Sequence, residues 1–237
     1  MSGEGAPPAV NHDVVLSLKD VRLSRGTRGV LNGVSFDVTR RSLVALMGPS
    51  GSGKTTVLRA IAALEAFDAG TIAVEGLTLT GGAVIPAATL KQLRRTVGFV
   101  FQFHHLFEHL PALKNVWLAP VHAHGVPLPK AEERARELLR ALGVEHRAPA
   151  LPRELSGGEA QRVAIARVLA VDPPLILMDE PTASLDPERR TELADILRRL
   201  TGENRTIIAA THDEEFAEAC AARILRLSDG VVSDQQR

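Results

Sequence analysis

The segment Gly48–Thr55 has the residue types and spacing of a phosphate-binding loop. It follows the apolar run Leu43–Met47 and precedes a predicted amphipathic helix, so strand, loop and helix come in the required order. Glycines let backbone N–H groups converge on phosphate oxygens, and the helix N-terminus adds positive potential. Lys54 would bridge the β- and γ-phosphates and Thr55 would bind Mg²⁺, whereas a plain glycine- and serine-rich turn would do neither. The nucleotide contacts predicted for this segment are Gly48, Pro49, Ser50, Gly51, Ser52, Gly53, Lys54, Thr55 and Thr56.

Two carboxylates, Asp179 and Glu180, follow a second apolar run, Leu175–Met178. Such a run predicts a buried strand, and open α/β sheets bind their ligands at the carboxyl ends of strands. We expect Asp179 on the Mg²⁺ side of the nucleotide. Glu180 would face an attacking water, because phosphoryl transfer needs a residue that orients or deprotonates the nucleophile. The alternative for the two carboxylates is a solvated strand end.

A second glycine-containing turn, Leu155–Arg162, opens a predicted helix over Val163–Ala170. It offers a second potential anion site at a helix N-terminus. A chain with two such sites has a use for both if it dimerises and each chain closes its neighbour's nucleotide. On the residues alone, a plain helix cap at Ser156 is an equally good interpretation.

The elements that must position these motifs alternate between strands and helices. Helical spacing places Val57, Leu58, Ile61 and Leu64 on one face after the phosphate loop. The other predicted strands are 14–18, 34–38, 71–74, 97–101 and 206–210, with turn residues Thr27, Gly29, Asn32 and Gly33 between the first two. The other predicted helices are 130–142 with a Glu132–Arg136 pair, a helix that begins with Asp186 as N-cap and Pro187 as N1, and 214–222. The alternation predicts an α/β fold with a largely parallel sheet.

Charge and composition exclude several classes of protein. The 237 residues carry 28 basic and 28 acidic side chains, so no net charge draws the chain to nucleic acid, and we expect no such partner. The single cysteine, Cys220, excludes an intramolecular disulfide. The uncharged stretch Gly76–Leu90 contains glycines and a proline, which excludes a spanning helix there. Residues 1–13 lack the features of a secretory signal, so we expect a cytoplasmic protein that reaches a membrane through a partner.

Six motifs in order make the chain resemble the ATP-binding subunit of an ABC transporter, over Val14 to Val232. They are residues 48–55 as Walker A, Gln102 as the Q-loop glutamine, Leu155–Gln161 as the LSGGQ signature with Glu159 where Gln is usual, residues 175–180 as Walker B, Ser184–Asp186 as the D-loop and His212 as the switch histidine. Each motif alone would be a weak signal, and the six together are specific.

This resemblance implies that two such domains sandwich two ATP molecules, each between one chain's Walker A and the other chain's signature. Glu180 would then be the general base, and His212 would contact the γ-phosphate and hold the attacking water. Gln102 would sense the γ-phosphate and Mg²⁺. The implied metal contacts are Thr55, Gln102 and Asp179, and the further nucleotide contacts are Gln102, Ser156, Gly157, Gly158, Glu159 and Asp186.

The resemblance also implies an architecture. It is a P-loop NTPase core with a mostly parallel sheet, an antiparallel β-subdomain from residues 14–40 and about 70–80, and an inserted helical subdomain over about 103–155 that docks on transmembrane subunits. We therefore expect a disordered leader over 1–13, a single ABC ATPase domain over 14–232 and a tail over 233–237.

Within the family, Phe103–Leu110 and Thr211–Ala217 resemble the polar amino-acid importer branch. That branch implies a homodimer bound to transmembrane permease subunits on the inner face of the membrane, with a substrate-binding protein as a further partner. The alternative is a lipoprotein-release or exporter-type ATPase, which differs in partner and not in chemistry. Besides Glu159, three residues depart from the usual pattern: Pro111, Lys114 and Arg25, which stands where an aromatic side chain normally stacks on adenine.

Soluble ABC ATPases of DNA repair are disfavoured, because they carry coiled coils or zinc insertions and no heptad array separates Lys54 from Asp179. Translation-type ABC proteins are also disfavoured, because they carry two cassettes in one chain and this sequence shows one.

Overall fold

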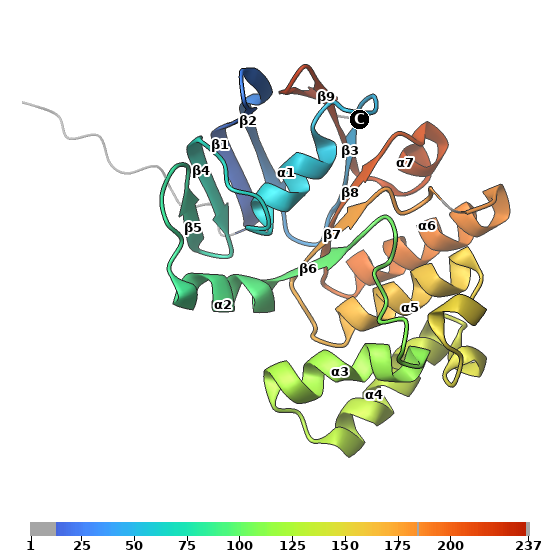
Figure 1. Cartoon of the computed structure of the whole chain (residues 1–237). Coiled ribbons are helices and arrows are strands. Elements are labelled where there is room, and N and C mark those ends of the chain that lie inside the picture. Colours follow the sequence, from blue (N-terminus) through green and yellow to red (C-terminus); the bar gives the residue numbers. More distant parts are fainter. Residues whose placement is uncertain (1–12, 184, 236–237) are drawn as a thin grey trace, which may run out of the picture.

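The computed structural model describes residues 13–183 and 185–235, which form two β-sheets surrounded by helices (Figure 1). This arrangement confirms the predicted α/β fold with a mostly parallel sheet and a separate antiparallel sheet. The predicted leader up to residue 12, Ser184 of the predicted D-loop and the last two residues lie outside the described part of the chain. No helix among the described residues is long and apolar enough to cross a bilayer.

The larger sheet has six strands in the order β10-β9-β3-β8-β7-β6. Neighbouring strands from β9 to β6 run parallel, and β10 pairs antiparallel with β9 at the edge. The strands are β3 (Leu43–Met47), β6 (Val97–Val100), β7 (Leu175–Asp179), β8 (Thr206–Thr211), β9 (Arg223–Ser228) and β10 (Val231–Gln235). The central strands are continuous apolar runs because both faces of this sheet are covered.

Alternate residues of each central strand enter two different cores. In β7, Ile176 and Met178 pack on one face, while Leu175 and Leu177 pack on the other. The first core includes residues of α5 (Gly157–Leu169), α6 (Pro187–Gly202) and α7 (Glu214–Cys220). The second includes α1 (Lys54–Ile61) and the antiparallel sheet. This two-residue alternation is what a strand buried on both sides requires.

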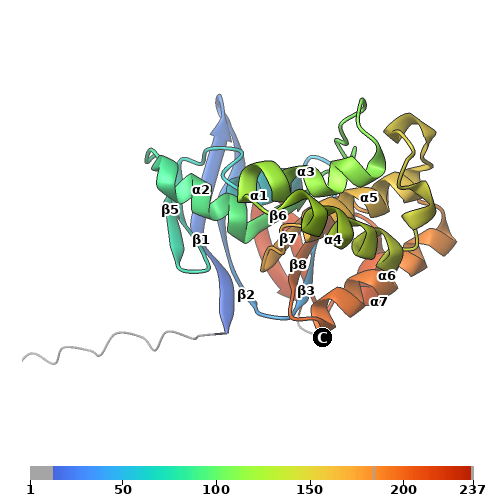
Figure 2. The ribbon, with the colours of Figure 1, turned by 90° about the horizontal axis from the view of Figure 1, so that it is seen from below.

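The antiparallel sheet has the order β2-β1-β4-β5 and lies at one end of the molecule, with α5 to α7 at the other (Figures 1 and 2). Its strands are β1 (Val14–Arg25), β2 (Arg28–Thr39), β4 (Ala69–Val74) and β5 (Leu77–Thr80). The first two are longer than predicted, and Gly29, Asn32 and Gly33 lie inside β2 and not in a turn. Shifts in the β1–β2 register, together with a positive φ of 99° at Gly33, let the ladder continue through residues that favour turns.

Three further helices precede α5, and the sequence predicted only the last of them. They are α2 (Ala87–Thr96), α3 (Ala112–His124) and α4 (Leu128–Ala141). Two short 3₁₀ turns, Glu145–Arg147 and Pro152–Glu154, connect α4 to α5. In α4 the predicted Glu132–Arg136 pair is present, with 2.9 Å between its nitrogen and oxygen.

Several predicted helix limits were wrong. Helix α1 ends at Ile61, because Ala63 has a left-handed φ of 51°, and Leu64 is 55% exposed instead of lying on the buried face. Helix α5 begins at Gly157 and not at Val163, because Ser156 caps it and the glycines form its first turn. The prediction for α6 is confirmed, with Asp186 as N-cap and proline in the first turn.

The last strand also reaches further than expected. In β10, residues 233–235 pair with β9, although the sequence placed them in a tail beyond the domain. Their pairing adds an antiparallel edge to the parallel sheet, and Arg223 of β9 holds Asp234 of β10 at 2.6 Å.

The close packing of β6 on α5 generates a test. A Cβ on Gly98 would lie 2.3 Å from Val168 Cγ1 and 2.8 Å from Pro173 Cγ, so Gly98→Ala should lower the free energy of unfolding by about 1–3 kcal/mol. Gly202→Ala is the control, because no atom lies within 4 Å of its added Cβ, and it should leave stability unchanged or raise it by up to about 1 kcal/mol. Urea unfolding of both variants checks this, and equal midpoints would contradict the packing.

Candidate active site

The parallel register brings motifs far apart in the sequence to one edge of the sheet. Met47 at the end of β3 pairs with Thr211 of β8, and Asp179 of β7 pairs with Ala210. The residues that follow each strand therefore lie side by side. They surround a cavity of about 240 Å³, lined by Ser50, Gly51, Gly53, Lys54, Thr55, Gln102, Glu180 and His212.

The loop before α1 wraps around the side chain of Lys54. Lys54 Nζ donates to the carbonyl oxygens of Gly48 at 2.7 Å and Pro49 at 3.3 Å, and the residue is only 6% exposed. Gly48 is needed for this path, because a Cβ there would lie 2.2 Å from the carbonyl oxygen of Leu227. The loop thus holds a buried cation at the N-terminus of a helix, which is the arrangement that binds phosphate.

Thr55 and Asp179 make the second wall of the site. Thr55 Oγ1 donates to Asp179 Oδ1 at 2.9 Å, and Asp179 is 5% exposed. Burial raises the pKa of the Asp179 carboxyl, and the hydrogen bond from Thr55 partly offsets this. A hydroxyl and a carboxylate at this separation, with the amide of Gln102 on the same cavity, are oxygen donors of the kind that Mg²⁺ prefers.

Glu180 lies between the ammonium of Lys54 and the imidazole of His212. Its Oε2 is 2.8 Å from His212 Nδ1, and its Oε1 is 3.4 Å from Lys54 Nζ. The Glu180 backbone has a left-handed φ of 46° and donates its N–H to the carbonyl of Ala210 at 2.8 Å. Strained backbone of this kind gathers at functional sites, and here it aims the carboxylate into the cavity.

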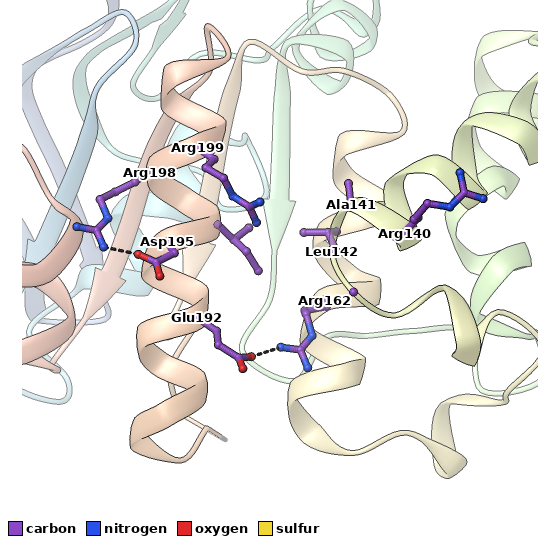
Figure 3. Close-up of a pocket in the computed structure, with 10 residues that line it drawn as sticks. Arg140, Ala141, Leu142, Arg162, Glu192, Asp195, Arg198 and Arg199 are labelled. Atoms are coloured by element: carbon purple, nitrogen blue, oxygen red, sulfur yellow. Dashed lines mark hydrogen bonds and ion pairs between the residues drawn. The ribbon is translucent and has the colours of Figure 1, made fainter.

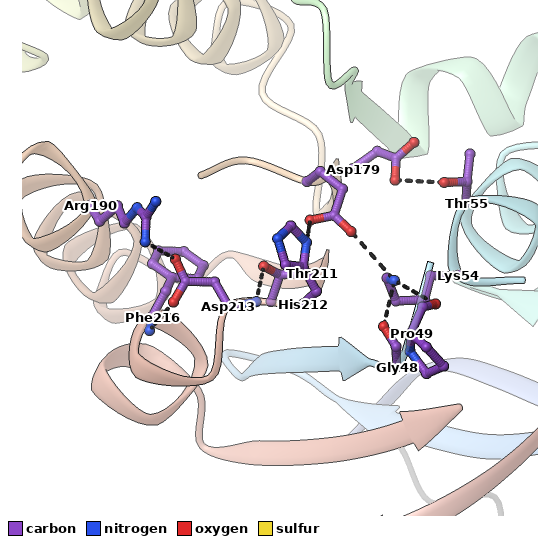
Figure 4. A network of polar contacts seen from close by, with 11 residues as sticks. Gly48, Pro49, Lys54, Thr55, Asp179, Arg190, Thr211, His212, Asp213 and Phe216 are labelled. Atoms are coloured by element: carbon purple, nitrogen blue, oxygen red, sulfur yellow. Dashed lines mark hydrogen bonds and ion pairs between the residues drawn. The ribbon is translucent and has the colours of Figure 1, made fainter. Parts of the chain in front are cut away.

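The turn that carries His212 is fixed from both sides. Asp213 caps α7 by accepting the N–H of Phe216 at 3.0 Å, and its own N–H donates to Thr211 Oγ1 at 3.1 Å. Arg190 of α6 also pairs with Asp213 at 3.1 Å (Figure 4). His212 is held by its neighbours while its own side chain is 64% exposed on the open side of the cavity.

The remaining predicted contacts lie elsewhere. Ser156, Gly157, Gly158, Glu159 and Asp186 do not line the cavity in the described chain. Instead they form the N-termini of α5 and α6, where Ser156 and Asp186 are the caps. A single chain therefore carries the phosphate loop and the signature as separate surfaces.

The signature contains a capping box, which the sequence analysis did not identify. Ser156 accepts the N–H of Glu159 at 3.3 Å, and the Glu159 carboxylate accepts the N–H of Ser156 at 2.7 Å. The spacing S-x-x-E was the available signal. Arg147 lies 3.3 Å from Glu159, and the backbone hydrogen bond followed by this cation lowers the pKa of that carboxyl. Ser156 is thus the N-cap of α5, and the cap leaves the proton of its hydroxyl available for a second contact.

A larger cavity of about 650 Å³ adjoins the phosphate loop at Ser50 and Gly51. Its other lining residues include Arg25, Arg28, Asn32 and Asp229, so it has the size and position for a nucleoside. Arg25 is not free there, because its Nη2 lies 2.5 Å from Glu65 Oε1 and 3.4 Å from Thr56 Oγ1. Its guanidinium is thus engaged in an ion pair with Glu65 beside the phosphate loop.

Comparison with known proteins agrees with this geometry. The family described as ABC transporter matches residues 31–183. The chain belongs to the ABC transporter family. The L-cystine transport system ATP-binding protein TcyN of Escherichia coli (strain K12) is 44% identical over 208 residues, which cover 87% of this chain and 83% of that protein. The glutamine transport ATP-binding protein GlnQ of the same strain is 40% identical over 220 residues, covering 93% and 90%.

A solved structure extends the comparison. The dimeric post-hydrolysis state of the ATP-binding cassette MJ0796, bound to ADP and Pi, has a TM-score of 0.83 and 33% identity, covering 93% of this chain and 98% of that one. These findings confirm the predicted ABC ATPase and its fold.

The base cavity of this ABC ATPase generates a test. Since Arg25 is committed to Glu65, affinity should rest on the phosphate loop, and ATP and GTP should bind within about tenfold of each other, or about 1.4 kcal/mol. Arg25→Tyr should tighten ATP binding by supplying a stacking surface. Arg22→Tyr is the control, because Arg22 pairs with Asp20 and does not line this cavity. Titration of each variant with ATP and with GTP measures these affinities. A strong preference for ATP that Arg25→Tyr leaves unchanged would show that another group binds the adenine.

Proposed function

We propose that this chain is the ATP-hydrolysing motor subunit of an amino-acid importer. The observation that carries the proposal is the Glu180 carboxylate, held 2.8 Å from His212 and 3.4 Å from Lys54 in a cavity formed by the phosphate loop. The cystine and glutamine transport proteins among the relatives favour an importer over the exporter-type alternative. As domain limits we propose one ABC ATPase domain over 14–235, since residues 233–235 pair with β9, with a helical subdomain over about 103–155.

Each wall of the cavity has a part in binding the triphosphate. The loop N–H groups of residues 48 and 50–53 and Lys54 Nζ would hold the β- and γ-phosphates, while Ser50 and Gly51 continue toward the base cavity. Thr55, Asp179 and Gln102 would hold Mg²⁺, which neutralises charge on the phosphates when bound. Thr56, buried at the start of α1, supports the loop from below.

In the hydrolytic step, Glu180 would take the proton of the attacking water. Lys54 lies near Oε1, so drawing its ammonium onto the phosphates would free that oxygen to accept the proton. His212 Nδ1 would remain hydrogen-bonded to Oε2 of Glu180 and so fix the orientation of that carboxylate. The imidazole is exposed on the side from which a γ-phosphate and a second chain would approach.

A second copy of the chain would complete the site. Ser156, Gly157, Gly158, Glu159 and Asp186 do not line the cavity of their own chain, and they present exposed helix N-termini. A homodimer in which each signature faces the partner's phosphate loop would use both surfaces. The MJ0796 cassette is described as dimeric, which supports this arrangement.

The transmembrane partner would dock beside Gln102. The next residue, Phe103, is 75% exposed and Phe107 is 45% exposed, while Leu106 between them is buried. The backbone here is fixed: Arg167 donates to the carbonyls of His104 at 2.7 Å and His105 at 2.6 Å. Two apolar rings held rigidly next to a nucleotide-sensing side chain suit a membrane-protein partner.

Buried Asn115 of α3 holds the other half of this segment. Its side chain accepts the N–H of Phe107 at 2.7 Å and donates to the carbonyl of Leu110 at 2.9 Å. Permease subunits docked here would keep the chain on the inner face of the membrane, and a substrate-binding protein would deliver the amino acid from the other side. We infer these partners from the names of the relatives and from this exposed surface.

The catalytic assignment predicts a separation of binding from hydrolysis. Glu180→Gln should bind ATP yet hydrolyse it at least about 10²-fold more slowly, the low end for a lost general base. Lys54→Ala should instead lose nucleotide binding. Phosphate release and nucleotide titration measure the two effects, and wild-type turnover in Glu180→Gln would remove Glu180 from the mechanism.

The docking assignment predicts a loss of partner without a loss of fold. The double variant Phe103→Ser and Phe107→Ser should bind a co-expressed permease at least about tenfold more weakly, because two apolar anchors are lost. Its ATPase activity and stability as an isolated chain should be unchanged. Val84→Ser is the control, being 95% exposed on a different segment. Crosslinking and co-purification measure the effect, and equal capture of all three chains would refute this surface.

A further inference from the structure

Arg189, in the first turn of α6, reaches across to the signature serine of α5. Its Nη1 donates to Ser156 Oγ at 3.1 Å. We propose that Arg189 is a further phosphate-binding residue, which contacts the γ-phosphate held by the partner chain and orients Ser156 toward it. The inference rests on the composite site proposed above and adds to it a cation that the six motifs do not include.

The hydrogen-bond count at Ser156 explains the orienting part. A serine hydroxyl accepts two hydrogen bonds and donates one. Both acceptor positions are occupied, by the N–H of Glu159 at 3.3 Å and by Arg189 at 3.1 Å. The hydroxyl proton is therefore directed away from both, and its natural partner is an external acceptor. An oxygen of a phosphate is such an acceptor.

The guanidinium itself is fixed by the residue that caps its helix. Asp186 Oδ2 lies 3.1 Å from Arg189 Nε, and Asp186 Oδ1 accepts the backbone N–H of Arg189 at 3.0 Å. A guanidinium has five N–H donors. The contact of Nε with Asp186 uses one and the contact of Nη1 with Ser156 uses another, so three remain for a phosphate. A planar guanidinium with adjacent free donors binds phosphate oxygens in pairs.

The glycine of the signature makes room for this side chain. A Cβ on Gly158 would lie 3.0 Å from Arg189 Nη1 and 3.1 Å from its Cδ. Arg189 thus packs over the first turn of α5, beside the N–H groups that a helix N-terminus offers to an anion. The cation and the helix end would act on the same phosphate.

A second contact ties the two helices together further along. Arg162 Nη1 of α5 lies 2.8 Å from Glu192 Oε2 of α6, across a cleft of about 850 Å³ and in its lower part as seen in Figure 3. Two polar contacts between α5 and α6, Arg189 with Ser156 and Arg162 with Glu192, therefore hold Arg189 over Ser156. The negative charge nearest to Ser156 on α5, Glu159, is engaged by Arg147 at 3.3 Å.

The test measures ATP-driven dimerisation in the Glu180→Gln background, by sedimentation with ATP and Mg²⁺. Arg189→Leu should weaken the dimer at least about tenfold, the low end for lost hydrogen bonds to a charged group. Arg189→Lys should weaken the dimer less than Arg189→Leu does, because lysine keeps the positive charge. It should still weaken the dimer, because lysine lacks the planar pair of N–H donors of a guanidinium. Arg199→Leu is the control, since this exposed arginine of α6 lines the cleft (Figure 3), whose lining does not include Ser156.

Two further readouts separate binding from structure. Affinity of the monomer for ADP and the midpoint of urea unfolding should be the same in Arg189→Leu and the background, because neither involves the γ-phosphate contact. Dimerisation of Arg189→Leu as tight as that of the background would overturn the inference while leaving the composite site standing. An unaltered background that stays monomeric with ATP would refute the composite site and the role of Arg189 with it.

Discussion

The parallel pairing of β3, β8 and β7 determines where every reactive group of this chain lies. Because Met47 pairs with Thr211 and Asp179 with Ala210, the residues after each strand emerge together at one edge of the sheet. The phosphate loop, Glu180 and His212 are the first residues past those strand ends. Both faces of the strands are buried in separate cores, so a shift of one residue would exchange the cores and is strongly resisted. The rigidity of the site thus comes from the sheet, and the loops only complete it.

The same sheet also explains why the site is open. Helices α5 and α6 pack on one face of the sheet, and their N-termini carry Ser156 and Asp186 away from the cavity that holds Lys54 and Glu180. Contacts between α5 and α6, such as Arg162 with Glu192, make these two helix ends a single surface. A mechanism that needs both surfaces must bring in a second chain, which links hydrolysis to association. The exposed Phe103, one residue after Gln102, would pass that association on to a membrane partner.

Most of the reactive residues could be predicted from the sequence, because each belongs to a local motif with fixed spacing. The phosphate loop, the Asp179–Glu180 strand end and Asp186 as a helix cap are of this kind. Contacts between distant elements were not predictable in this way. Arg25 lines the base cavity as expected, but its pairing with Glu65 depends on how the segment after α1 lies beside the end of β1. The contact of Arg189 with Ser156 was not predicted, since nothing in the local sequence reveals that the first turn of α6 lies beside Ser156. Helix α3 was missed within a predicted helical region, and it contains an internal Pro120 that weakens its local signal.

The central claim is that ATP is enclosed by two chains, and a photoreactive group on its γ-phosphate tests this directly. An unlabelled (light) Glu180→Gln chain would be mixed with a ¹⁵N-labelled (heavy) Lys54→Ala chain, which should not bind ATP in its own phosphate loop. The mixture would then be irradiated in the presence of the photoreactive nucleotide. Trypsin releases the signature of both chains as residues 154–162, and the phosphate loop as residues 42–54 of the light chain or 42–59 of the Lys54→Ala chain. The account predicts label on the heavy 154–162 peptide, because that signature faces the light chain's nucleotide. Label confined to light peptides, with none on the heavy signature, would show that each chain closes its own site and would contradict the account.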